Sequence, residues 1–492
     1  MDSEKETLSQ EIAPSPKVDA VGAANQPCPT ELRRLLRKID LRVIPILALL
    51  YFLSFLDRGN IGNAEIQGLS TDLNLVGNQY NWCLTIFFFP YSFFEPLCNL
   101  LLVRFKPSIW LPSIMVAWGA VTTLLGIVQN YSGLLAARFF LGLSEGGLFP
   151  GLAFYVSLWY PRANAQFRLA LIFASASMAG AFSGLLAFAI SKMDGVGGLE
   201  GWRWIFILEG LLTVVCAVLA FFVIWDEPST ATFLSGREKA IIIDLLADSR
   251  ASSTEGQLEE KSAFDWKQFL AAVLDWQTWM HAISYWGAAV AVYALSLFLP
   301  TIIKGLGYSS AIAQLLTIPV YAAASIACIA VGYFSDRMGQ RSLFTLVCYG
   351  AVFVGFLIAV APSRFIPGLT YAGCFIAASG SYPAIPGLLA LSSNNYAPAT
   401  KRAVGMAIQI GLGSLGGAAA SNFYKKTDAP RYRLGHSLVL AFVALGFLTV
   451  VLYYFLCRRI NAKRDRGEAT ASQNPDGIFE MGDKAPTFRY NL

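Results

Sequence analysis

Charged side chains are scarce in this sequence. Of its 492 residues, 14% are Asp, Glu, Lys or Arg and 55% are apolar, whereas soluble globular domains carry about 25% charge. This balance excludes an ordinary soluble domain. The formal net charge of +5 does not indicate a nucleic-acid partner, because the basic residues follow the positive-inside distribution of membrane proteins. We therefore expect an integral membrane protein in contact with lipid.

Histidines and paired cysteines are also few. His281 and His436, the only two histidines, lack metal-ligand spacing. The eight cysteines show neither the spacing of a disulfide framework nor that of a zinc site. A membrane enzyme would need a nucleophile and a base, or metal ligands, facing each other, and no such constellation of His, Cys and Asp stands out. We expect no enzyme activity, no metal and no cofactor.

Long apolar runs dominate what remains. A run of about 20 residues crosses the hydrocarbon core of a bilayer as a helix, and the sequence holds twelve such candidates. The expected fold is therefore an all-α integral membrane protein. The candidates lie near 41–61, 79–102, 109–128, 132–155, 168–190, 202–225, 276–302, 310–333, 342–361, 365–391, 400–424 and 436–457.

The longest polar segment, 226–275, divides these spans into two sets of six. Within it, Ser235 and Glu238 form the capping-box pattern that opens a short amphipathic helix. The N-terminus is rich in Ser, Glu, Pro and Gln and lacks the apolar core of a signal peptide, which indicates a disordered tail. The expected division is a tail over 1–40, a six-helix bundle over 41–225, a linker over 226–275, a second bundle over 276–457 and a C-terminal tail over 458–492.

The two halves carry a weak internal repeat. "PGLAFYVSLWY" begins at Pro150 and "PGLLALSSNNY" begins at Pro386, and each closes the fourth span of its half before a basic turn. Two six-span halves in the same orientation are typical of transporters with pseudo-twofold symmetry and a midplane substrate site. Most Lys and Arg residues lie in the tails and the even-numbered connections, which predicts that both termini are cytoplasmic.

The fourth span contains two charges, Arg138 and Glu145, in the run "RFFLGLSEGGLFPG". Each charge costs roughly 2.5–3.5 kcal/mol at the centre of a membrane helix. Their seven-residue separation places them on one helix face but roughly 10 Å apart. Arg138 either ties this helix to another or faces a water-filled cavity, where its planar fork suits a carboxylate. Glu145 can take up a proton when desolvated, which makes it a candidate proton carrier.

Further polar groups accompany this pair. Asp57 and Arg58 end the first span and are either helix-terminal residues or part of the same site. Glu95 in the second span is either a helix-packing acid or a coupling site. The second half offers neutral groups, among them Tyr382 and Asn394, which can cap backbone carbonyls or contact a ligand. A ligand between the halves would then be an anion with an additional polar or aromatic portion.

One motif points to a family. "GYFSDRMGQR", residues 332–341, resembles the loop signature Gly-x-x-x-Asp-Arg-x-Gly-x-Arg of the major facilitator superfamily. The first glycine allows two helices to approach, the aspartate sits near a helix N-terminus, and the arginines can clamp helix ends. Breaking and remaking this clamp would gate alternating access. The expected gating residues are Gly332, Asp336, Arg337, Gly339 and Arg341.

Within that superfamily, "LDRGNIGNA" (56–64), the fourth-span run and "GWRWIFILEG" (201–210) together resemble the anion:cation symporter family. The similarity extends to fungal permeases for allantoate, nicotinate and related organic acids. The resemblance implies that Asp57 and Glu145 carry protons. It also implies substrate contact by two arginines and two neutral groups, namely Arg58, Arg138, Asn394 and Tyr382.

The sequence thus predicts a proton-coupled importer of a small organic anion, acting as a monomer in the plasma membrane. The alternative is a proton-coupled exporter of a metabolite or toxin. The fifth span, "SMAGAFSGLLA" at 177–187, lacks the proline expected of drug/proton antiporters, which counts against export. A nutrient receptor that binds without transporting is the alternative outside transport, and uptake of a labelled ligand would separate the two.

Overall fold

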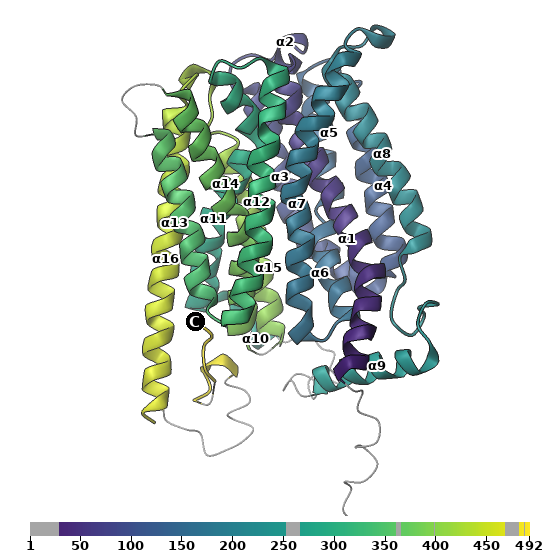
Figure 1. Cartoon of the computed structure of the whole chain (residues 1–492), viewed down its shortest axis with the longest axis vertical. Helices are drawn as coiled ribbons and strands as arrows, with labels where there is room; N and C mark the ends of the chain where they lie inside the picture. Colours follow the sequence, from purple (N-terminus) through teal and green to yellow (C-terminus); the bar gives the residue numbers. More distant parts are fainter. Residues whose placement is uncertain (1–28, 252–265, 361–365, 398, 468–481, 487) are drawn as a thin grey trace, which may run out of the picture.

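A computed structural model describes residues 29–251, 266–360, 366–397, 399–467, 482–486 and 488–492. In this part of the chain the long elements are all α-helices, arranged as an upright bundle of two halves (Figure 1). Eleven helical stretches of the described residues are long and apolar enough to cross a membrane, and α5 and α6 together make one of these. The helix α3 is not one of the eleven, but it stands beside them in the bundle as a further span (Figure 1). The expected order of twelve spans is confirmed by this arrangement.

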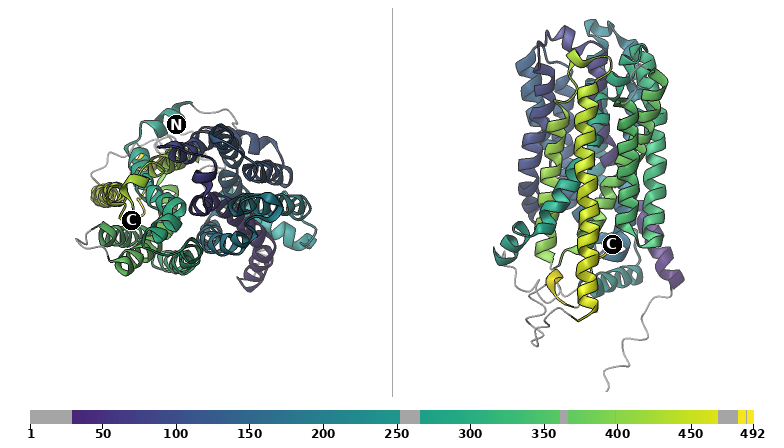
Figure 2. Two further views of the ribbon diagram at one scale, coloured as in Figure 1. Left: turned by 90° about the horizontal axis from the view of Figure 1, so that it is seen from above. Right: turned by 90° about the vertical axis from the view of Figure 1, so that its left-hand side faces the viewer.

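The first half is built from α1 (Pro29–Ile66), α3 (Gln79–Arg104), α4 (Pro107–Leu125), α5 (Tyr131–Glu145), α6 (Leu148–Trp159), α7 (Arg162–Ile190) and α8 (Gly201–Val223). The short α2 (Leu69–Asp72) follows α1. The second half is built from α11 (Trp276–Gly305), α12 (Ser310–Met338), α13 (Arg341–Val360), α14 (Pro367–Asn395), α15 (Ala399–Ala420) and α16 (Arg433–Asp465). Viewed from above, the halves stand side by side around a central axis (Figure 2).

The fourth span consists of two helices in line. The α-helix α5 ends at Glu145 and α6 begins at Leu148, with Gly146 and Gly147 between them. Glycine has a low helix propensity, and two in succession favour a break. The predicted span at 132–155 is therefore interrupted next to its acidic residue.

The first helix begins earlier than the sequence predicts. It starts at Pro29, so residues 29–40 are helical rather than part of a disordered tail. Leu35, Leu36 and Ile39 are buried while Arg33 and Arg37 are exposed, and this helical period is hidden in the sequence by the dense basic residues. The tail predicted for residues 1–28 lies outside the described residues.

The linker contains α9 (Gly236–Ala251) and α10 (Trp266–Val273). The capping box at the start of α9 is confirmed: the Glu238 amide donates to Ser235 Oγ at 3.3 Å, and the Ser235 amide donates to Glu238 Oε2 at 2.8 Å. Lys38 of α1 forms an ion pair with Glu238 at 2.7 Å. These contacts tie α9 to the first half.

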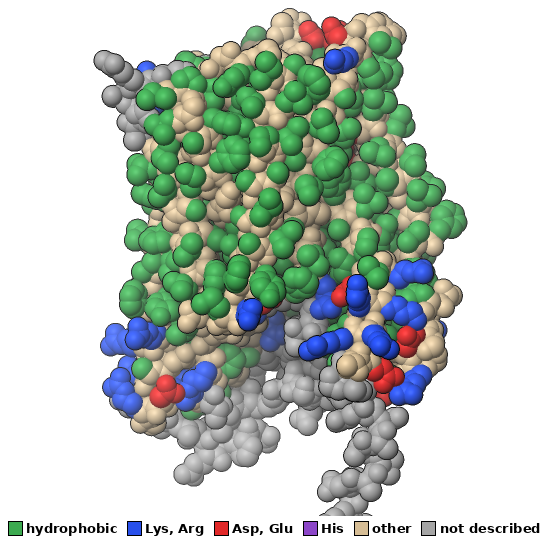
Figure 3. All heavy atoms as spheres, viewed as in Figure 1, with side chains coloured by type: hydrophobic (Ala, Val, Ile, Leu, Met, Phe, Trp, Pro, Cys, Tyr) green, Lys and Arg blue, Asp and Glu red, His purple; other side chains and the backbone are tan. Residues whose placement is uncertain are grey.

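One end of the bundle carries α9, α10, the start of α1 and the C-terminal residues (Figure 1). Lys and Arg side chains gather at this end, whereas the middle of the surface is apolar (Figure 3). We call it the basic end. The grouping of both described chain ends on one side agrees with an even number of spans.

The halves close against each other at the opposite end. Gly62 of α1 lies so near α11 that a Cβ there would be 2.5 Å from the Leu297 carbonyl oxygen. Lys304 and Ser310 each donate to the Ile66 carbonyl oxygen at 2.8 Å. The bundle is thus sealed at this end.

Candidate functional site

A cavity of about 410 Å³ lies between the halves toward the basic end. The first half contributes α6 and α7 to its walls, and the second half contributes α12, α13, α14 and α15. Most of the lining is apolar, and the polar lining residues come from the second half. They are Ser335, Asp336, Thr345, Ser393, Asn394 and Arg402.

A smaller central pocket of about 40 Å³ adjoins this cavity, since Phe149, Phe173 and Ile410 line both. Among its described lining residues Arg58 is the only charged one. Eight lining residues are aromatic, which gives the pocket walls of ring faces and edges. They are Tyr51, Phe55, Tyr91, Phe149, Phe173, Tyr285, Tyr293 and Tyr382.

Arg58 is held in the central pocket by an ion pair with Glu145 of the fourth span. The two side chains are buried, with relative exposures of 3% and 1%. Ser54 Oγ donates to the same Glu145 Oε1 atom at 2.7 Å, and Arg58 Nη1 donates to the Tyr293 hydroxyl oxygen at 3.3 Å. The pairing compensates both charges where water is largely excluded, and Tyr293 brings the second half into contact with it.

Aromatic rings surround the guanidinium group of Arg58. Its central carbon lies 4.8 Å from the ring centre of Phe55, 5.1 Å from that of Tyr91 and 5.3 Å from that of Phe87. The electron-rich faces of such rings attract a cation. The rings therefore continue to stabilise the positive charge of Arg58 when one carboxylate replaces another as its partner.

Close packing against α3 positions the end of α5 that carries Glu145. A Cβ at Gly142 would lie 2.1 Å from the Phe87 carbonyl oxygen of α3, so only glycine permits this approach of α5 to α3. Glu145 is the last residue of α5, one turn further along the same helix. This close approach fixes Glu145 beside α3, whose Phe87 and Tyr91 rings also contact Arg58.

Asp57 faces away from the central pocket, although it precedes Arg58 in the sequence. Its Oδ2 atom accepts hydrogen bonds from Trp118 Nε1 and Thr213 Oγ1, each at 3.0 Å. Consecutive residues of a helix point about 100° apart, which separates the two charges. Asp57 lies inside the first half, between α1, α4 and α8.

Arg138 also lies inside the first half. It is fully buried, its Nε atom donates to the Cys83 carbonyl oxygen at 3.2 Å, and its guanidinium carbon lies 5.1 Å from the Phe87 ring centre. In this conformation it makes a contact between α5 and α3, as the first of the two sequence interpretations expects. It is not among the described residues that line the two cavities.

The two neutral residues of the second half do reach the cavities. Tyr382 lines the central pocket, with its ring centre 5.9 Å from that of Tyr321. Asn394 lines the larger cavity beside Ser393. Tyr382 is therefore near Arg58, whereas Asn394 lies further toward the basic end.

The signature at 332–341 covers the last turns of α12, the two linking residues Gly339 and Gln340, and the first residue of α13. Arg341 lies 3.6 Å from Asp336 and donates from Nη1 to the Ala390 carbonyl oxygen of α14 at 3.3 Å. Gly339 ends α12 with φ +67°, a conformation that favours glycine. Gly332 and Asp336 line the cavity and Arg337 is exposed. One arginine thus ties three helices together, and the gating role stays a prediction.

Several residues of the pocket carry no sequence signal strong enough to single them out. Ser54, Tyr91, Tyr285 and Tyr293 are ordinary residues for membrane helices, and only their meeting around Arg58 distinguishes them. The spacing of Tyr51, Ser54 and Arg58 follows one helix face. That spacing becomes informative only once α5 and α11 are placed.

Comparison with known proteins identifies the family of this chain. Residues 47–421 match the profile of the Major Facilitator Superfamily. The "MFS-type transporter cnsO" of Penicillium expansum is 35% identical over 94% of this chain and 90% of its own length. The "High-affinity nicotinic acid transporter" of Saccharomyces cerevisiae is 34% identical over 93% of this chain and 84% of its own length.

A solved structure shares the fold. A bacterial homologue of the human lysosomal transporter Spinster, in an inward-facing and unoccupied conformation, superimposes with a TM-score of 0.61 over 84% of this chain and 96% of its own, at 15% identity. The chain belongs to the major facilitator superfamily. It is a multi-pass membrane transporter for a small molecule and not an enzyme.

Proposed function

We propose that this protein imports a small organic anion together with protons. The observation that carries the proposal is Arg58, a cation at the end of the cavity between the halves, paired with Glu145. An arginine keeps its charge at any physiological pH and its fork matches a carboxylate in two places. A substrate carboxylate can therefore replace the Glu145 carboxylate on Arg58.

The walls support a substrate with one carboxylate and a flat body. The central pocket has one described cation and eight aromatic side chains, and aromatic rings favour stacked or edge-to-face partners. The adjoining cavity of about 410 Å³ lies within the range of small-molecule sites. The relative named a nicotinic acid transporter supports the same class, an aromatic monocarboxylate.

Glu145 supplies the coupling in this proposal. While ionised it occupies Arg58 and excludes the substrate anion. A proton on Glu145 removes its charge, weakens its hold on Arg58 and leaves the guanidinium free for the incoming carboxylate. Proton and anion then enter as a neutral pair, which a bundle with low polarity accommodates more easily than either charge alone.

The geometry favours Arg58 over Arg138 as the anion contact and Glu145 over Asp57 as the coupling carboxylate. Arg58 lines the pocket and holds Glu145 directly, whereas Arg138 and Asp57 make contacts inside the first half. We propose that Arg138 and Asp57 adjust the positions of α5 and α1. Asn394 and Tyr382 would contact the substrate on its path.

The orientation follows from the basic end. Because Lys and Arg concentrate on the cytoplasmic side of membrane proteins, we propose that this end faces the cytoplasm and that the cavity is open inward. The protein would reside in the plasma membrane. Closure at the basic end and opening at the opposite end would complete the transport cycle. In this cycle the contacts of Arg341 with Asp336 and Ala390 would break and re-form.

Proteoliposomes with radiolabelled nicotinate as the probe test this function. We expect accumulation when the compartment outside the vesicle is more acidic, and its loss in Arg58→Gln. The control is Arg489→Gln, which breaks an exposed ion pair with Asp465 and lies at a residue that lines neither cavity. Binding without accumulation would indicate a receptor, and efflux against the expected direction would indicate an exporter.

A further inference from the structure

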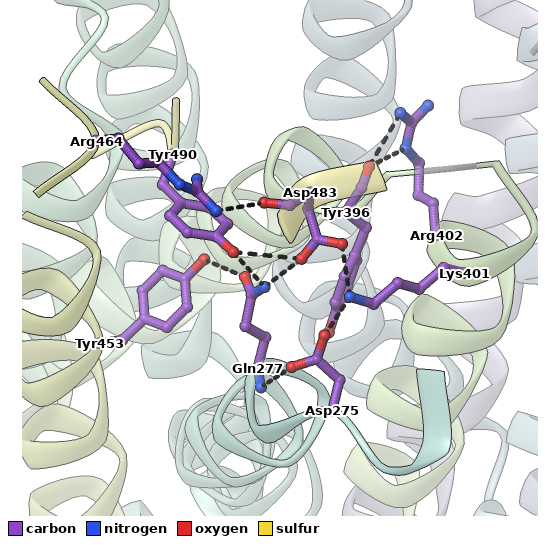
Figure 4. A network of polar contacts seen from close by, with 9 residues as sticks. All are labelled: Asp275, Gln277, Tyr396, Lys401, Arg402, Tyr453, Arg464, Asp483 and Tyr490. Atoms are coloured by element: carbon purple, nitrogen blue, oxygen red, sulfur yellow. Dashed lines mark hydrogen bonds and ion pairs between the residues drawn. The ribbon is translucent and has the colours of Figure 1, made fainter. Parts of the chain in front are cut away.

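The C-terminal residues fold back onto the basic end of the second half. Residues 482–486 and 488–492, which we call the C-terminal strap, return to α11, α14, α15 and α16 after α16 has ended (Figure 4). Gly482–Lys484 forms a single 3₁₀ turn at its start. A tail predicted only as a C-terminal extension is thus packed against the helices that form the cavity.

A buried ionic group fixes the first part of the strap. Asp483 is 1% exposed, and its Oδ1 atom accepts from Lys401 Nζ at 2.6 Å. Lys401, itself buried, also forms an ion pair with Asp275, the N-cap residue of α11. Gln277 Nε2 donates to Asp483 Oδ2 at 2.6 Å. One cation therefore links the strap to the starts of α11 and α15.

Backbone atoms of the strap pair with the junction of α14 and α15. The Asp483 amide donates to the Ala397 carbonyl oxygen at 3.2 Å. The Asn491 amide donates to Asn395 Oδ1 at 2.7 Å, and Asn395 Nδ2 donates to the Asn491 carbonyl oxygen at 3.0 Å. The two-way pairing sets the position of Asn395 at the end of α14.

Tyr490 anchors the middle of the strap. Its backbone amide and carbonyl pair with the side chain of Asn461, both at 2.9 Å, and the guanidinium of Arg464 lies over its ring at 4.8 Å. Tyr490 also packs in an apolar cluster with Leu391 and Tyr453. The strap thus combines charge, backbone pairing and apolar burial on a few residues.

The anchored residues stand next to residues of the cavity wall. Asn395 follows Asn394 and Lys401 precedes Arg402, and Asn394 and Arg402 line the cavity of about 410 Å³. Arg402 in turn donates to the Tyr396 carbonyl oxygen at 3.2 and 3.3 Å. The strap holds Asn395, Ala397 and Lys401 in place, and it therefore also sets the positions of the neighbouring wall residues Asn394 and Arg402.

We propose that the C-terminal strap is a working part of the cavity wall, in which Asp483 and Tyr490 act as positioning residues for Asn394 and Arg402. Burying three charges is costly unless they are well paired, and such groups are better suited to specifying one arrangement than to adding stability. With respect to substrate handling, the inference rests on the function proposed above. The strap itself belongs to the structure whatever the substrate.

Labelling of a cysteine in the cavity tests the strap without any transport. Asn394→Cys is introduced into the full-length protein in nanodiscs, and the rate of reaction with a water-soluble maleimide is compared with that of the parent protein. Adding Asp483→Asn should speed labelling by roughly fivefold or more, at the lower end of couplings between linked sites. Asp483→Glu should restore most of the slow rate, because the charge returns.

The matched control is Arg489→Gln, which breaks the exposed strap ion pair with Asp465 and should leave the labelling rate unchanged. Equal rates with Asp483→Asn and Arg489→Gln would overturn the proposal. If Asp483→Asn does not fold, Tyr490→Phe replaces it. This change removes the hydroxyl that accepts from Gln277 Nε2 at 3.2 Å and donates to Asp483 Oδ2 at 3.4 Å, and an unchanged rate there would also overturn the proposal. In chains with Asn394 intact, Asp483→Asn should raise KM for nicotinate exchange more than it lowers the maximal rate.

These readouts separate the two proposals. If nicotinate is not transported but Asp483→Asn still speeds labelling, the proposal for the strap stands and the proposed substrate class is rejected. If nicotinate is transported but Asp483→Asn leaves the labelling rate unchanged, the substrate class stands and the proposal for the strap is rejected.

Discussion

Arg58 and Glu145 meet across 87 residues of sequence, joined by an ion pair between the first and fourth spans. The cavity at the basic end leads toward this pair, and Tyr293 from the other half also contacts Arg58. An ion pair inside a membrane bundle is stable only while both partners remain charged and in contact. A neutral replacement of either partner leaves the other charge buried and unpaired, so the folded fraction of each variant is measured alongside its transport.

Replacing Glu145 should separate coupling from exchange. Glu145→Gln keeps the size of the side chain but cannot carry a proton, so accumulation driven by a pH gradient should be lost. Counterflow exchange of nicotinate should persist, because Arg58 is then free for the substrate carboxylate. Uphill uptake at the normal level in this variant would reject Glu145 as the coupling carboxylate.

The planar fork of Arg58 should matter beyond its charge. Arg58→Lys retains the cation but loses bidentate pairing and stacking on the rings. We expect roughly tenfold to 100-fold weaker nicotinate binding, about 1.4–2.8 kcal/mol, measured by isothermal titration. Arg203→Lys, at an arginine that pairs with Glu200 outside the pocket, serves as the control, and equal affinities in the two variants would contradict the role.

The sealed end should depend on Gly62. Gly62→Ala places a methyl group 2.5 Å from the Leu297 carbonyl oxygen, and such overpacking typically costs about 1–3 kcal/mol. The halves should then separate at this end, and Asn394→Cys in the cavity should label more slowly because the basic end closes. Gly236→Ala, where a Cβ meets nothing within 4 Å, should leave labelling unchanged. No difference between the two would show that this contact does not seal the bundle.

The buried charges Asp275, Lys401 and Asp483, which hold the strap, should be unequal in their effect on stability. Lys401→Met leaves Asp275 and Asp483 buried without their shared cation, and removing one partner of a buried pair typically costs about 3–5 kcal/mol. Asp483→Asn should cost less, since Lys401 keeps Asp275. Thermal unfolding in nanodiscs would measure both, and a greater loss in Asp483→Asn would refute this order.

Acid should not loosen the strap through Asp483. Burial raises the pKa of Asp483 above its usual range, although Lys401 opposes the rise. The folded protein then binds the proton more tightly than the unfolded chain, so the free energy of unfolding gains from protonation as pH falls through the raised pKa. Between about pH 7.5 and about pH 5, the Tm of the wild type should not fall relative to that of Asp483→Asn. A relative decline would contradict the sign.

The spans could be predicted from sequence because a bilayer demands about 20 apolar residues per helix. The charge pair could not, because spacing along one helix links Arg138 to Glu145, whereas the actual partner of Glu145 lies on another helix. Adjacency in the sequence does not predict shared surroundings either, since Asp57 and Arg58 face different sides of α1.

The packing of the C-terminal strap could not be predicted from the sequence either. Its residues are as polar as those of a solvent-exposed tail, and their burial depends on Lys401 and Asp275, which lie far away in sequence. The capping box of α9 succeeded for the opposite reason, because Ser235 and Glu238 satisfy each other within one turn. Local hydrogen bonding can be inferred from a sequence, and partners brought together by folding cannot.

The interruption of the fourth span between Glu145 and Leu148 gives its two helices separate contacts. The helix α5 holds the Glu145 carboxylate against Arg58, while α6 presents Phe149 and Ala153 to the cavity. Two glycines separate the helices, and glycine permits a wide range of backbone angles, so in the proposed cycle α6 changes its angle to α5 without stretching the Arg58–Glu145 contact. In the cycle proposed above, replacing these glycines with alanine would therefore tie each closure at the basic end to the position of the Glu145 carboxylate.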